Sequence, residues 1–349
     1  MKNYAFYTTS EAAWRGMYEA AENARESIYW EIYILRNNTP QFPFVKLLEK
    51  KARAGVRVRI ILDRFGSFGF GSRDLDALRA AGADIRFFNT LLKSLVHRTH
   101  RKIFIVDEKV CFLGGVNVAE EHRLWRDLTV KLSGRIVRVF VRSFARIYIH
   151  AGGADPLLRA AACSRTGAYP RRTWLLEHWP FKGRRHLNAY YRAASRRAEK
   201  SIQMVTPYFA PHPWLLRSLI RATRRGVAVS LLLPARANHL FAHIANIVMA
   251  ASLSHYGVRT LLLPSMIHAK VLIIDGHEGM IGSNNIDAQS FDFNLEASVV
   301  LARRDMVGDL RRIMRQWENE AVPFEPKEYE DRWYSWFFKF LTRLLQPIL

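Results

Sequence analysis

Three segments of this sequence occur twice, in the same order along the chain. The matched pairs are residues 25–33 with 199–208, residues 53–62 with 224–233, and residues 100–107 with 268–275. The separation between partners changes only slowly along the chain, as it does when two copies of one domain differ in the lengths of their loops. This repetition constrains the fold strongly, because both halves must form the same structure. We therefore predict two tandem domains of one fold, related by a pseudo-twofold axis.

Each copy alternates apolar strand patterns with helical patterns. Helices are expected over residues 44–54 and 214–225, and each is followed by a Gly-Val pair, which is typical of a helix end that leads into a strand. This alternation predicts an α/β sandwich with a parallel or mixed sheet. The expected organisation is a first domain over residues 1–150, a connecting segment over 151–185, a second domain over 186–321 and a tail over 322–349.

The composition excludes several classes of protein. With 349 residues, of which 49% are hydrophobic, the chain is too long and too apolar to be a disordered segment. Its two cysteines, Cys111 and Cys163, cannot build a disulfide framework or a cysteine-rich metal site. No window supplies the ~18–20 apolar residues of a membrane-spanning helix, and the start lacks the apolar core of a signal peptide. We therefore expect a protein that faces the cytosol and does not cross a membrane by itself.

The charge balance points to a polyanionic partner. Lysine and arginine number 53 against 31 acidic residues, which gives a formal net charge of +22. Folding does not need such an excess, so it favours binding to nucleic acid or to an anionic membrane surface.

The third repeated segment carries a His-x-Lys motif in each copy. On a strand, alternation places His100 and Lys102 on one face, and His268 and Lys270 likewise. The four residues that follow each motif are all apolar, so each strand is expected to be buried. A buried histidine and lysine are costly unless they face a polar cavity. Because both copies have the motif, we predict one shared site between the domains rather than two satisfied core histidines.

Two imidazoles and two ammonium groups suit a phosphodiester. The lysines neutralise the non-bridging oxygens, where charge grows in the transition state. One neutral imidazole can attack phosphorus while the other, protonated, donates its proton to the leaving alkoxide. This division requires an environment that separates the two pKa values. The chemistry requires no metal and no other cofactor.

Two further pairs of polar residues keep the repeat spacing. Asn117 follows His100 at the distance at which Asn285 follows His268, and both come after glycines that allow close backbone approach. We predict that these asparagines bind phosphate oxygens. The acids Asp127 and Glu296 open the next strand of each copy. We predict that they orient the histidines through their second ring nitrogen, although they could also be strand-edge acids in salt bridges.

The motif also contains an aspartate in each copy, Asp107 and Asp275. We include both among the candidate catalytic residues, with the two histidines and the two lysines. Asp107 lies an odd number of residues after His100, so on a continuous strand it points to the other face. Since both aspartates also stand in segments typical of hairpin turns, a structural role in the turn is the favoured interpretation.

These residues make the sequence similar to the phospholipase D superfamily, whose signature is a duplicated His-x-Lys-x4-Asp motif. Both copies are intact, and the Gly-Gly-x-Asn and Gly-Ser-x-Asn segments that follow also match. The resemblance extends from about residue 27 to about residue 301. The segments 206–209 and 225–234 resemble bacterial cardiolipin synthases, in the form without amino-terminal spanning helices. The segment 177–180 departs from the usual pattern, which has an asparagine-containing stretch there.

The resemblance implies two phospholipase D-like α/β sandwich domains with the active site at their interface. It implies transfer of a phosphatidyl group from one phosphatidylglycerol to a second, with release of glycerol. The intermediate would be a phosphohistidine on His100, with His268 as the acid. The implied partners are anionic phospholipids and the membrane surface, on the cytoplasmic face of a bacterial inner membrane, and no nucleic acid is expected.

Other functions fit the same four histidines and lysines. A phospholipid hydrolase differs from a transferase only in its acceptor, water in place of a glycerol hydroxyl, and the residues alone do not separate the two. A metal-independent nuclease would use the basic surface to hold a nucleic-acid backbone. A lipid-binding scaffold with a relict site is disfavoured by the intact motifs. The donor headgroup, glycerol or ethanolamine, stays open.

The tail carries an amphipathic pattern. Its apolar face suits an interfacial helix, and the predicted membrane-contact residues are Trp333, Trp336, Phe337 and Phe340. The same pattern also suits a helix that packs its aromatic face on the protein. A second apolar helix is expected over residues 239–254, which could line a lipid entry or belong to the core.

Overall fold

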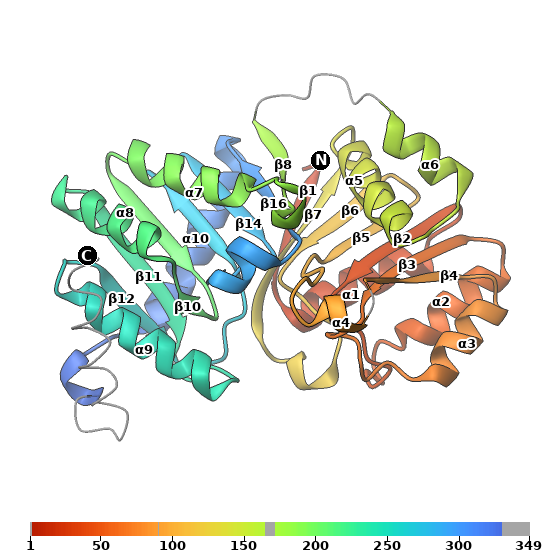
Figure 1. Cartoon of the computed structure of the whole chain (residues 1–349), viewed down its shortest axis with the longest axis horizontal. Helices are drawn as coiled ribbons and strands as arrows, with labels where there is room; N and C mark the ends of the chain where they lie inside the picture. The colour runs from red at the N-terminus through yellow and green to blue at the C-terminus, as the bar shows by residue number, and fades with distance from the viewer. Residues whose placement is uncertain (1, 90, 165–171, 330–349) are drawn as a thin grey trace.

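The computed structural model describes residues 2–89, 91–164 and 172–329. They form two α/β domains side by side, each built on one large mixed sheet (Figure 1). The predicted tandem arrangement of two α/β domains is therefore confirmed. Among the described helices, none is both long and apolar enough to cross a membrane.

The first sheet has the strand order β1-β7-β6-β5-β2-β3-β4 over the described residues. Its strands are β1 (Tyr4–Thr9), β2 (Ser27–Ile32), β3 (Arg57–Asp63), β4 (Asp84–Phe88), β5 (Ile103–Val106), β6 (Val110–Gly114) and β7 (Arg126–Ser133). Strands β2, β3 and β4 run parallel, and β5 is antiparallel to its neighbour β2.

The second sheet repeats this arrangement, with the order β17-β12-β11-β9-β13-β14-β16-β8 in the part of the chain described. Its strands are β8 (Thr173–His178), β9 (Ser201–Val205), β11 (Ala228–Pro234), β12 (Arg259–Leu263), β13 (Val271–Ile274), β14 (Glu278–Gly282), β16 (Glu296–Leu301) and β17 (Val322–Pro323). Strands β9, β11 and β12 run parallel, and β13 is antiparallel to β9. A short parallel pair joins β10 (Phe209–Ala210) to β15 (Ile286–Asp287).

Helices cover the sheets. They are α1 (Ser10–Glu22), α2 (Phe44–Arg53), α3 (Ser72–Ala80), α4 (Leu91–Ser94), α5 (Val137–His150), α6 (Pro156–Cys163), α7 (His186–Arg197), α8 (Pro213–Arg224), α9 (Leu240–Ser254) and α10 (Arg304–Glu320). Short helical turns are η1 (Glu120–His122), η2 (Pro180–Lys182), η3 (Gln289–Phe293) and η4 (Pro326–Tyr329). The predicted helices α2 and α8 end one residue before their predicted limits. Gly55 and Gly226 follow them with φ of 85° and 87°, values that a residue without a side chain adopts readily.

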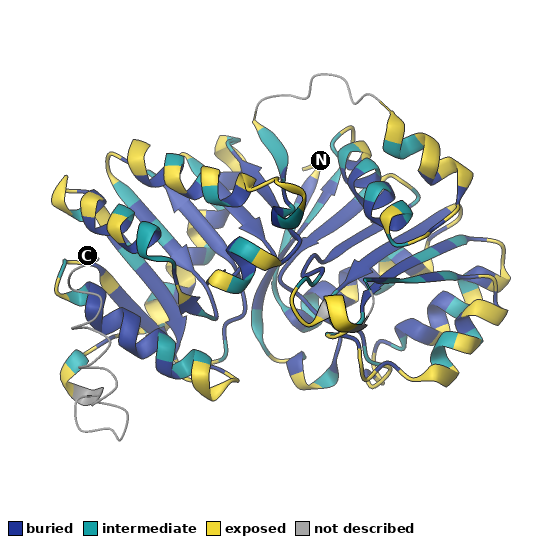
Figure 2. Ribbon diagram, in the orientation of Figure 1, coloured by how far each residue is buried: buried dark blue, intermediate teal, exposed yellow. Residues whose placement is uncertain are grey.

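Apolar side chains pack into layers on both faces of the sheets. Helices α1 to α3 pack on one face of the first sheet, and α7 to α9 pack on one face of the second. The third apolar cluster is shared by both domains and includes buried residues of α5 and α10, such as Phe144 and Trp317. The central strands of both sheets are largely buried, the edge strands β1 and β8 are mostly half-buried, and the helices expose their outer faces (Figure 2). This shared cluster fixes the two domains against each other.

Two segments differ from the expected organisation. The predicted connecting segment contains α6 and also β8, which pairs with β16 and completes the edge of the second sheet. In the predicted tail, β17 pairs with β12. The four aromatic residues predicted to contact membrane, Trp333, Trp336, Phe337 and Phe340, lie outside the described residues.

The topology places both His-x-Lys motifs at corresponding edges of the sheets. Because β5 is antiparallel to β2, the residues that precede β5 lie at the edge where β2, β3 and β4 end. The residues that precede β13 lie in the same way where β9, β11 and β12 end. The two histidines and the two lysines therefore stand at the carboxyl edge of the parallel strands in each domain.

Asp107 and Asp275 lie at the opposite ends of β5 and β13. The carboxylate of Asp107 accepts hydrogen bonds from the backbone N–H groups of residues 25–27, and Asp275 accepts them from residues 199–201. The shortest contact is 2.7 Å in both copies. Burial opposes ionisation, but these N–H groups outweigh it and lower the pKa of both carboxyls. Both aspartates thus hold a turn, and the structure does not place them with the histidines.

We expect Asp107→Ala to destabilise the fold, because it leaves three N–H groups without their acceptor. Losing such hydrogen bonds costs about 1–3 kcal/mol in the free energy of unfolding. Asp107→Asn keeps an acceptor oxygen and should lose less. Denaturant unfolding of both variants measures this difference. A full loss of activity with an unchanged unfolding midpoint would instead assign Asp107 to the reaction.

Candidate active site

The two His-x-Lys motifs meet where the domains join. His100, Lys102, His268 and Lys270 are buried, each at most 7% exposed. They also lie close enough to act on one another electrostatically. Lys270 contributes to lowering the pKa of His100, and Lys102 does the same to His268. The four side chains therefore form one site.

Backbone bridges between the domains position both histidines. Thr99 pairs with Leu295 and Arg126 pairs with Ile267, so the segment before each histidine runs beside the opposite domain. The N–H of His100 donates to the carbonyl of Leu295 at 2.9 Å, and the N–H of His268 donates to the carbonyl of Arg126 at 2.6 Å. Both histidines are thus held by the domain to which they do not belong.

Each histidine ring contacts a carboxylate of the other domain. Nδ1 of His100 lies 3.2 Å from Oε1 of Glu296, and Nδ1 of His268 lies 2.8 Å from Oδ2 of Asp127. These are the two acids predicted to orient the histidines, and both are almost fully buried. Gly115 allows this approach, because a Cβ at its position would lie 2.3 Å from Oδ1 of Asp127.

Both carboxyls are ionised. Burial opposes ionisation of Glu296, but His100, Lys102 and Ser283 outweigh it and lower its pKa to about 2. Burial is likewise outweighed at Asp127, mainly by His268, and its pKa is lowered. A carboxylate only accepts hydrogen bonds, so each Nδ1 must carry the hydrogen. The lone pair of both imidazoles is therefore on Nε2.

The histidines are neutral at pH 7 in this arrangement. Burial lowers the pKa of His100 to about 4, with Lys102 adding to the effect and Glu296 opposing it. Burial lowers the pKa of His268 to about 3, with Lys270 adding and Asp127 opposing. A neutral imidazole with a free Nε2 lone pair is a competent nucleophile.

The lysines stand beside the histidines. The Nζ of each lysine donates to the backbone carbonyl of the histidine two residues earlier, and Nζ of Lys270 lies 2.9 Å from Nε2 of His268. Burial lowers the pKa of both lysines to about 7, although Glu296 near Lys102 and Asp127 near Lys270 oppose the shift. An anion held between them would favour their charged forms.

The predicted phosphate-binding asparagines are both buried. Oδ1 of Asn117 accepts from the N–H of Ile34 at 3.3 Å, and the N–H of Asn285 donates to Oγ of Ser290 at 3.1 Å. Oδ1 of Asn285 is buried and makes no hydrogen bond. Both asparagines therefore stand in ordered loops that follow β6 and β14, but their role toward phosphate stays a prediction.

Three aromatic residues of the site were missed by the sequence reasoning. The ring centroid of Tyr33 lies 4.8 Å from that of His100, and the ring centroid of Tyr208 lies 6.5 Å from that of His268. Both tyrosines end the first repeated segment of their copy, so the repeat could have indicated them. The ring centroid of Trp125 lies 5.4 Å from that of His268, and no repeat signals it.

A buried ion network lies on the other side of the first motif. Arg101 stands between His100 and Lys102 and is fully buried. Its Nε lies 3.1 Å from Oε2 of the buried Glu31, and its Nη1 lies 3.7 Å from Oε1 of Glu177. Glu177 belongs to the segment that departs from the family pattern, and it brings a carboxylate from β8 of the second sheet.

Comparisons with known proteins place this geometry in a family. The family model described as "Cardiolipin synthase, PLD-like domain" matches residues 17–148 and 191–317. Cardiolipin synthase A of Pseudomonas fluorescens (strain SBW25) is 28% identical over 356 residues, which cover 97% of this chain and 73% of that protein. Cardiolipin synthase A of Pseudomonas putida (strain W619) is 29% identical over 333 residues, covering 91% and 68%.

Known structures share the fold at low identity. The phosphatidylserine synthase of Haemophilus influenzae Rd KW20 superposes with a TM-score of 0.75 at 14% identity, covering 99% of this chain and 95% of that one. The polyphosphate kinase of Porphyromonas gingivalis gives a TM-score of 0.64 at 14% identity, covering 99% and 53%. These likenesses show the fold. The family model, which matches both halves of the chain, shows that the chain belongs to the phospholipase D superfamily, in the cardiolipin synthase-like family.

Proposed function

We propose that the protein is a phosphatidyltransferase that makes cardiolipin from two molecules of phosphatidylglycerol. One observation carries the proposal. Two buried imidazoles, each bound through Nδ1 to a carboxylate of the other domain, lie beside two buried lysines. This arrangement supplies a nucleophile, a proton carrier and two cations for a phosphodiester.

The first half of the reaction forms a covalent intermediate. Nε2 of His100 attacks the phosphorus of the donor, and the bond between phosphorus and the glycerol oxygen breaks. His268, protonated when the anionic diester is bound, gives the proton on Nε2 to that oxygen. Lys102 and Lys270 neutralise the non-bridging oxygens, aided by Asn117 and Asn285. Free glycerol and phosphatidyl-His100 result.

In the second half of the reaction, His268 acts as a base and His100 is the leaving group. A terminal hydroxyl of a second phosphatidylglycerol attacks the phosphorus of phosphatidyl-His100, and the bond from phosphorus to Nε2 breaks. His268 takes the proton of that hydroxyl and is ready for the next cycle. Asp127 stabilises the imidazolium that forms on His268, and Glu296 stabilises the positive charge that the ring of His100 carries while it is bonded to phosphorus.

Exposed apolar residues near the site support a lipid substrate. Phe68, Leu92, Leu124 and Phe241 are between 73% and 87% exposed. Phe68 follows β3, Leu92 follows β4, Leu124 precedes β7 and Phe241 lies at the start of α9. All four therefore lie in loops or helix ends at the sheet edges that carry the histidines. With the net charge of +22, they favour docking on an anionic bilayer at the cytoplasmic face of the cell membrane.

The proposed activity is tested by incubating the purified protein with vesicles of labelled phosphatidylglycerol and separating the lipids. We expect labelled cardiolipin and free glycerol in equal amounts. Labelled phosphatidic acid as the sole lipid product would identify a hydrolase. Cleavage of an oligonucleotide with no change in the lipid would identify a nuclease.

We expect His100→Ala and His268→Ala each to lower the rate of transfer by ~1,000-fold or more, since one removes the nucleophile and the other the proton carrier. His277→Ala is a suitable control, because His277 is an exposed histidine in the turn after β13. The measurement is the initial rate of cardiolipin formation. More than a few per cent of activity in either active-site variant would contradict the two-histidine mechanism.

Anion affinity should depend on pH through the lysines. Their pKa of about 7 means that they lose charge as pH rises above neutrality, whereas a bound phosphate analogue keeps them protonated. Binding above pH 7 must therefore take up protons, and affinity should fall by up to about tenfold per pH unit for each lysine.

This dependence is measured by titrating vanadate against the protein at several pH values and correcting for the ionisation of vanadate itself. Lys102→Arg should have a weaker dependence, because a guanidinium stays charged throughout this range. An affinity that stays constant from about pH 6 to 9 would mean that the lysines keep their charge without the anion.

A further inference from the structure

A pocket of about 350 Å³ opens beside His268. Residues of both domains line it, including Trp125 from the first, and Arg236, Asn238, Leu240 and Met266 from the second. Three further cavities between described residues either stand apart from both motifs or are much smaller. This pocket is therefore the space to consider for a ligand that reacts at His268.

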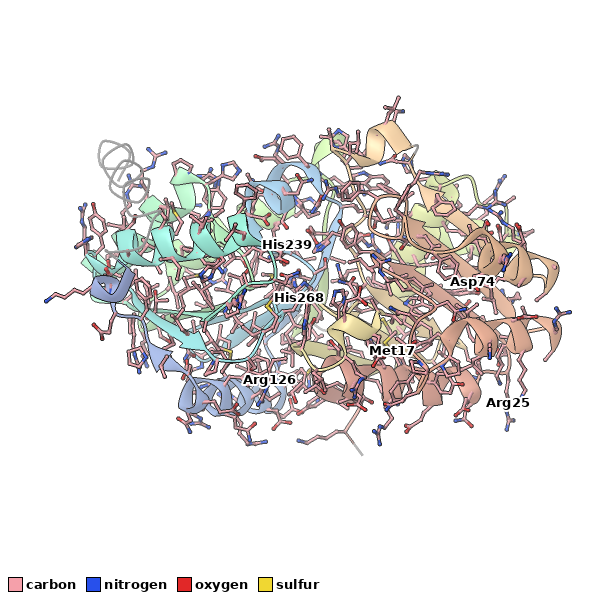
Figure 3. All side chains as sticks on the ribbon, turned by 90° about the horizontal axis from the view of Figure 1, so that it is seen from below. Met17, Arg25, Asp74, Arg126, His239 and His268 are labelled. Atoms are coloured by element: carbon pink, nitrogen blue, oxygen red, sulfur yellow. The ribbon has the colours of Figure 1, made fainter. Side chains whose placement is uncertain are left out.

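The pocket and the active site share walls. Trp125 lines the pocket and also packs against the ring of His268, with 5.4 Å between ring centroids. Tyr208 forms a second link, since its hydroxyl donates to Oδ1 of Asn238 at 2.7 Å and its ring centroid lies 5.9 Å from that of His239 and 6.5 Å from that of His268. Figure 3 shows His239 and His268 on neighbouring segments at the centre of the molecule.

The lining suits an anionic amphiphile. Arg236 supplies a cation, and the pocket's described lining contains no carboxylate. Leu240 and Met266 supply apolar surface, and Asn238 supplies a polar amide. At the rim, Leu240 is 60% exposed and the next residue, Phe241, is 87% exposed. An anionic headgroup with attached acyl chains matches this combination of one cation and an apolar rim.

The position of the pocket separates the acceptor from the donor. In the proposed reaction, the phosphate of the donor lies at the histidines and lysines, and only its neutral glycerol extends past His268. The acceptor also places a glycerol at His268, since that histidine takes its proton. Its own phosphodiester then lies one glycerol length further out, where the donor has no charge. A cation at that place acts on the acceptor alone.

We propose that this pocket binds the glycerophosphate headgroup of the acceptor lipid, with Arg236 paired to its phosphate. This inference rests on the proposed function. Trp125 forms the wall along the glycerol, and the acyl chains leave over Leu240 and Phe241. Because water has no phosphate for Arg236 to bind, the pocket favours a lipid acceptor over water and therefore favours transfer over hydrolysis.

The test uses phosphatidyl-p-nitrophenol as a fixed donor in mixed micelles, with phosphatidylglycerol varied as the acceptor. Nitrophenol release reports cleavage of the donor, and the ratio of cardiolipin-type product to phosphatidic acid reports use of the acceptor. For Arg236→Ala, we expect the apparent KM for the acceptor to rise about tenfold or more and the product ratio to fall. Arg236→Lys should recover part of the loss, since it keeps the charge.

Arg221→Ala provides a matched control. Arg221 is also exposed, but it lies in the last turn of α8, at the end of the second domain opposite to the motif. It should leave the acceptor dependence unchanged. If Arg236→Ala shows the same acceptor dependence as the wild type, the pocket inference is wrong while the transferase proposal stands. If the wild type releases nitrophenol but forms only phosphatidic acid, the transferase proposal itself fails.

A charge pair at one exposed position gives a second test. Leu240→Asp places a negative charge at the rim and should repel the acceptor phosphate, so the product ratio should fall. Leu240→Lys changes the same position to the opposite charge and should keep or raise the ratio. Equal effects of the two substitutions would overturn the assignment, because they would show that the apolar surface and not the phosphate is recognised there.

Discussion

The site depends on hydrogen bonds in which each domain supplies the carboxylate for the histidine of the other domain. Glu296 binds the histidine of the first domain, and Asp127 binds that of the second. The backbone bridges beside both histidines and the apolar cluster that includes α5 and α10 fix the two domains relative to each other, so each carboxylate stays beside its histidine. Neither domain therefore contains a complete pair of histidine and carboxylate by itself. The site therefore forms only when the two domains are paired.

The buried network around Arg101 serves the same geometry from the opposite face. Placing a guanidinium at 0% exposure is costly, and Glu31 and Glu177 compensate the charge. Glu31 comes from β2 beside the motif, whereas Glu177 comes from the second sheet. Breaking such a pair leaves a buried charge without its partner, so shifts of the strand that carries His100 and Lys102 are strongly disfavoured. The network thus restricts the first motif relative to the second domain.

The repeat explains why much of this architecture was predictable. The sheets, the helices α2 and α8 and the two orienting acids follow from segments that recur at similar spacing. The turn role of Asp107 followed from strand alternation. Trp125 and the bridge to Glu177 could not be found in this way, because they depend on which loops of one domain meet the other. Strand β8 was also missed, since a Gly-rich and Arg-rich surrounding conceals a short edge strand whose pairing with β16 is set by tertiary contacts.

The two copies differ in the loops beside their histidines, where the proposed reaction requires different surroundings. Aligning the second repeated segment places Asp63 opposite Pro234 and Phe65 opposite Arg236. In the first copy, Asp63 accepts from the N–H groups of Phe65, Gly66 and Thr99, and this folds the loop against the motif. A proline cannot fold its loop in that way, and the second copy has a pocket at this place. A symmetric pair of sites would offer both histidines the same surroundings. A closed loop beside His100 and an open pocket beside His268 suit one residue that holds the intermediate and one that exchanges protons with departing and arriving alcohols.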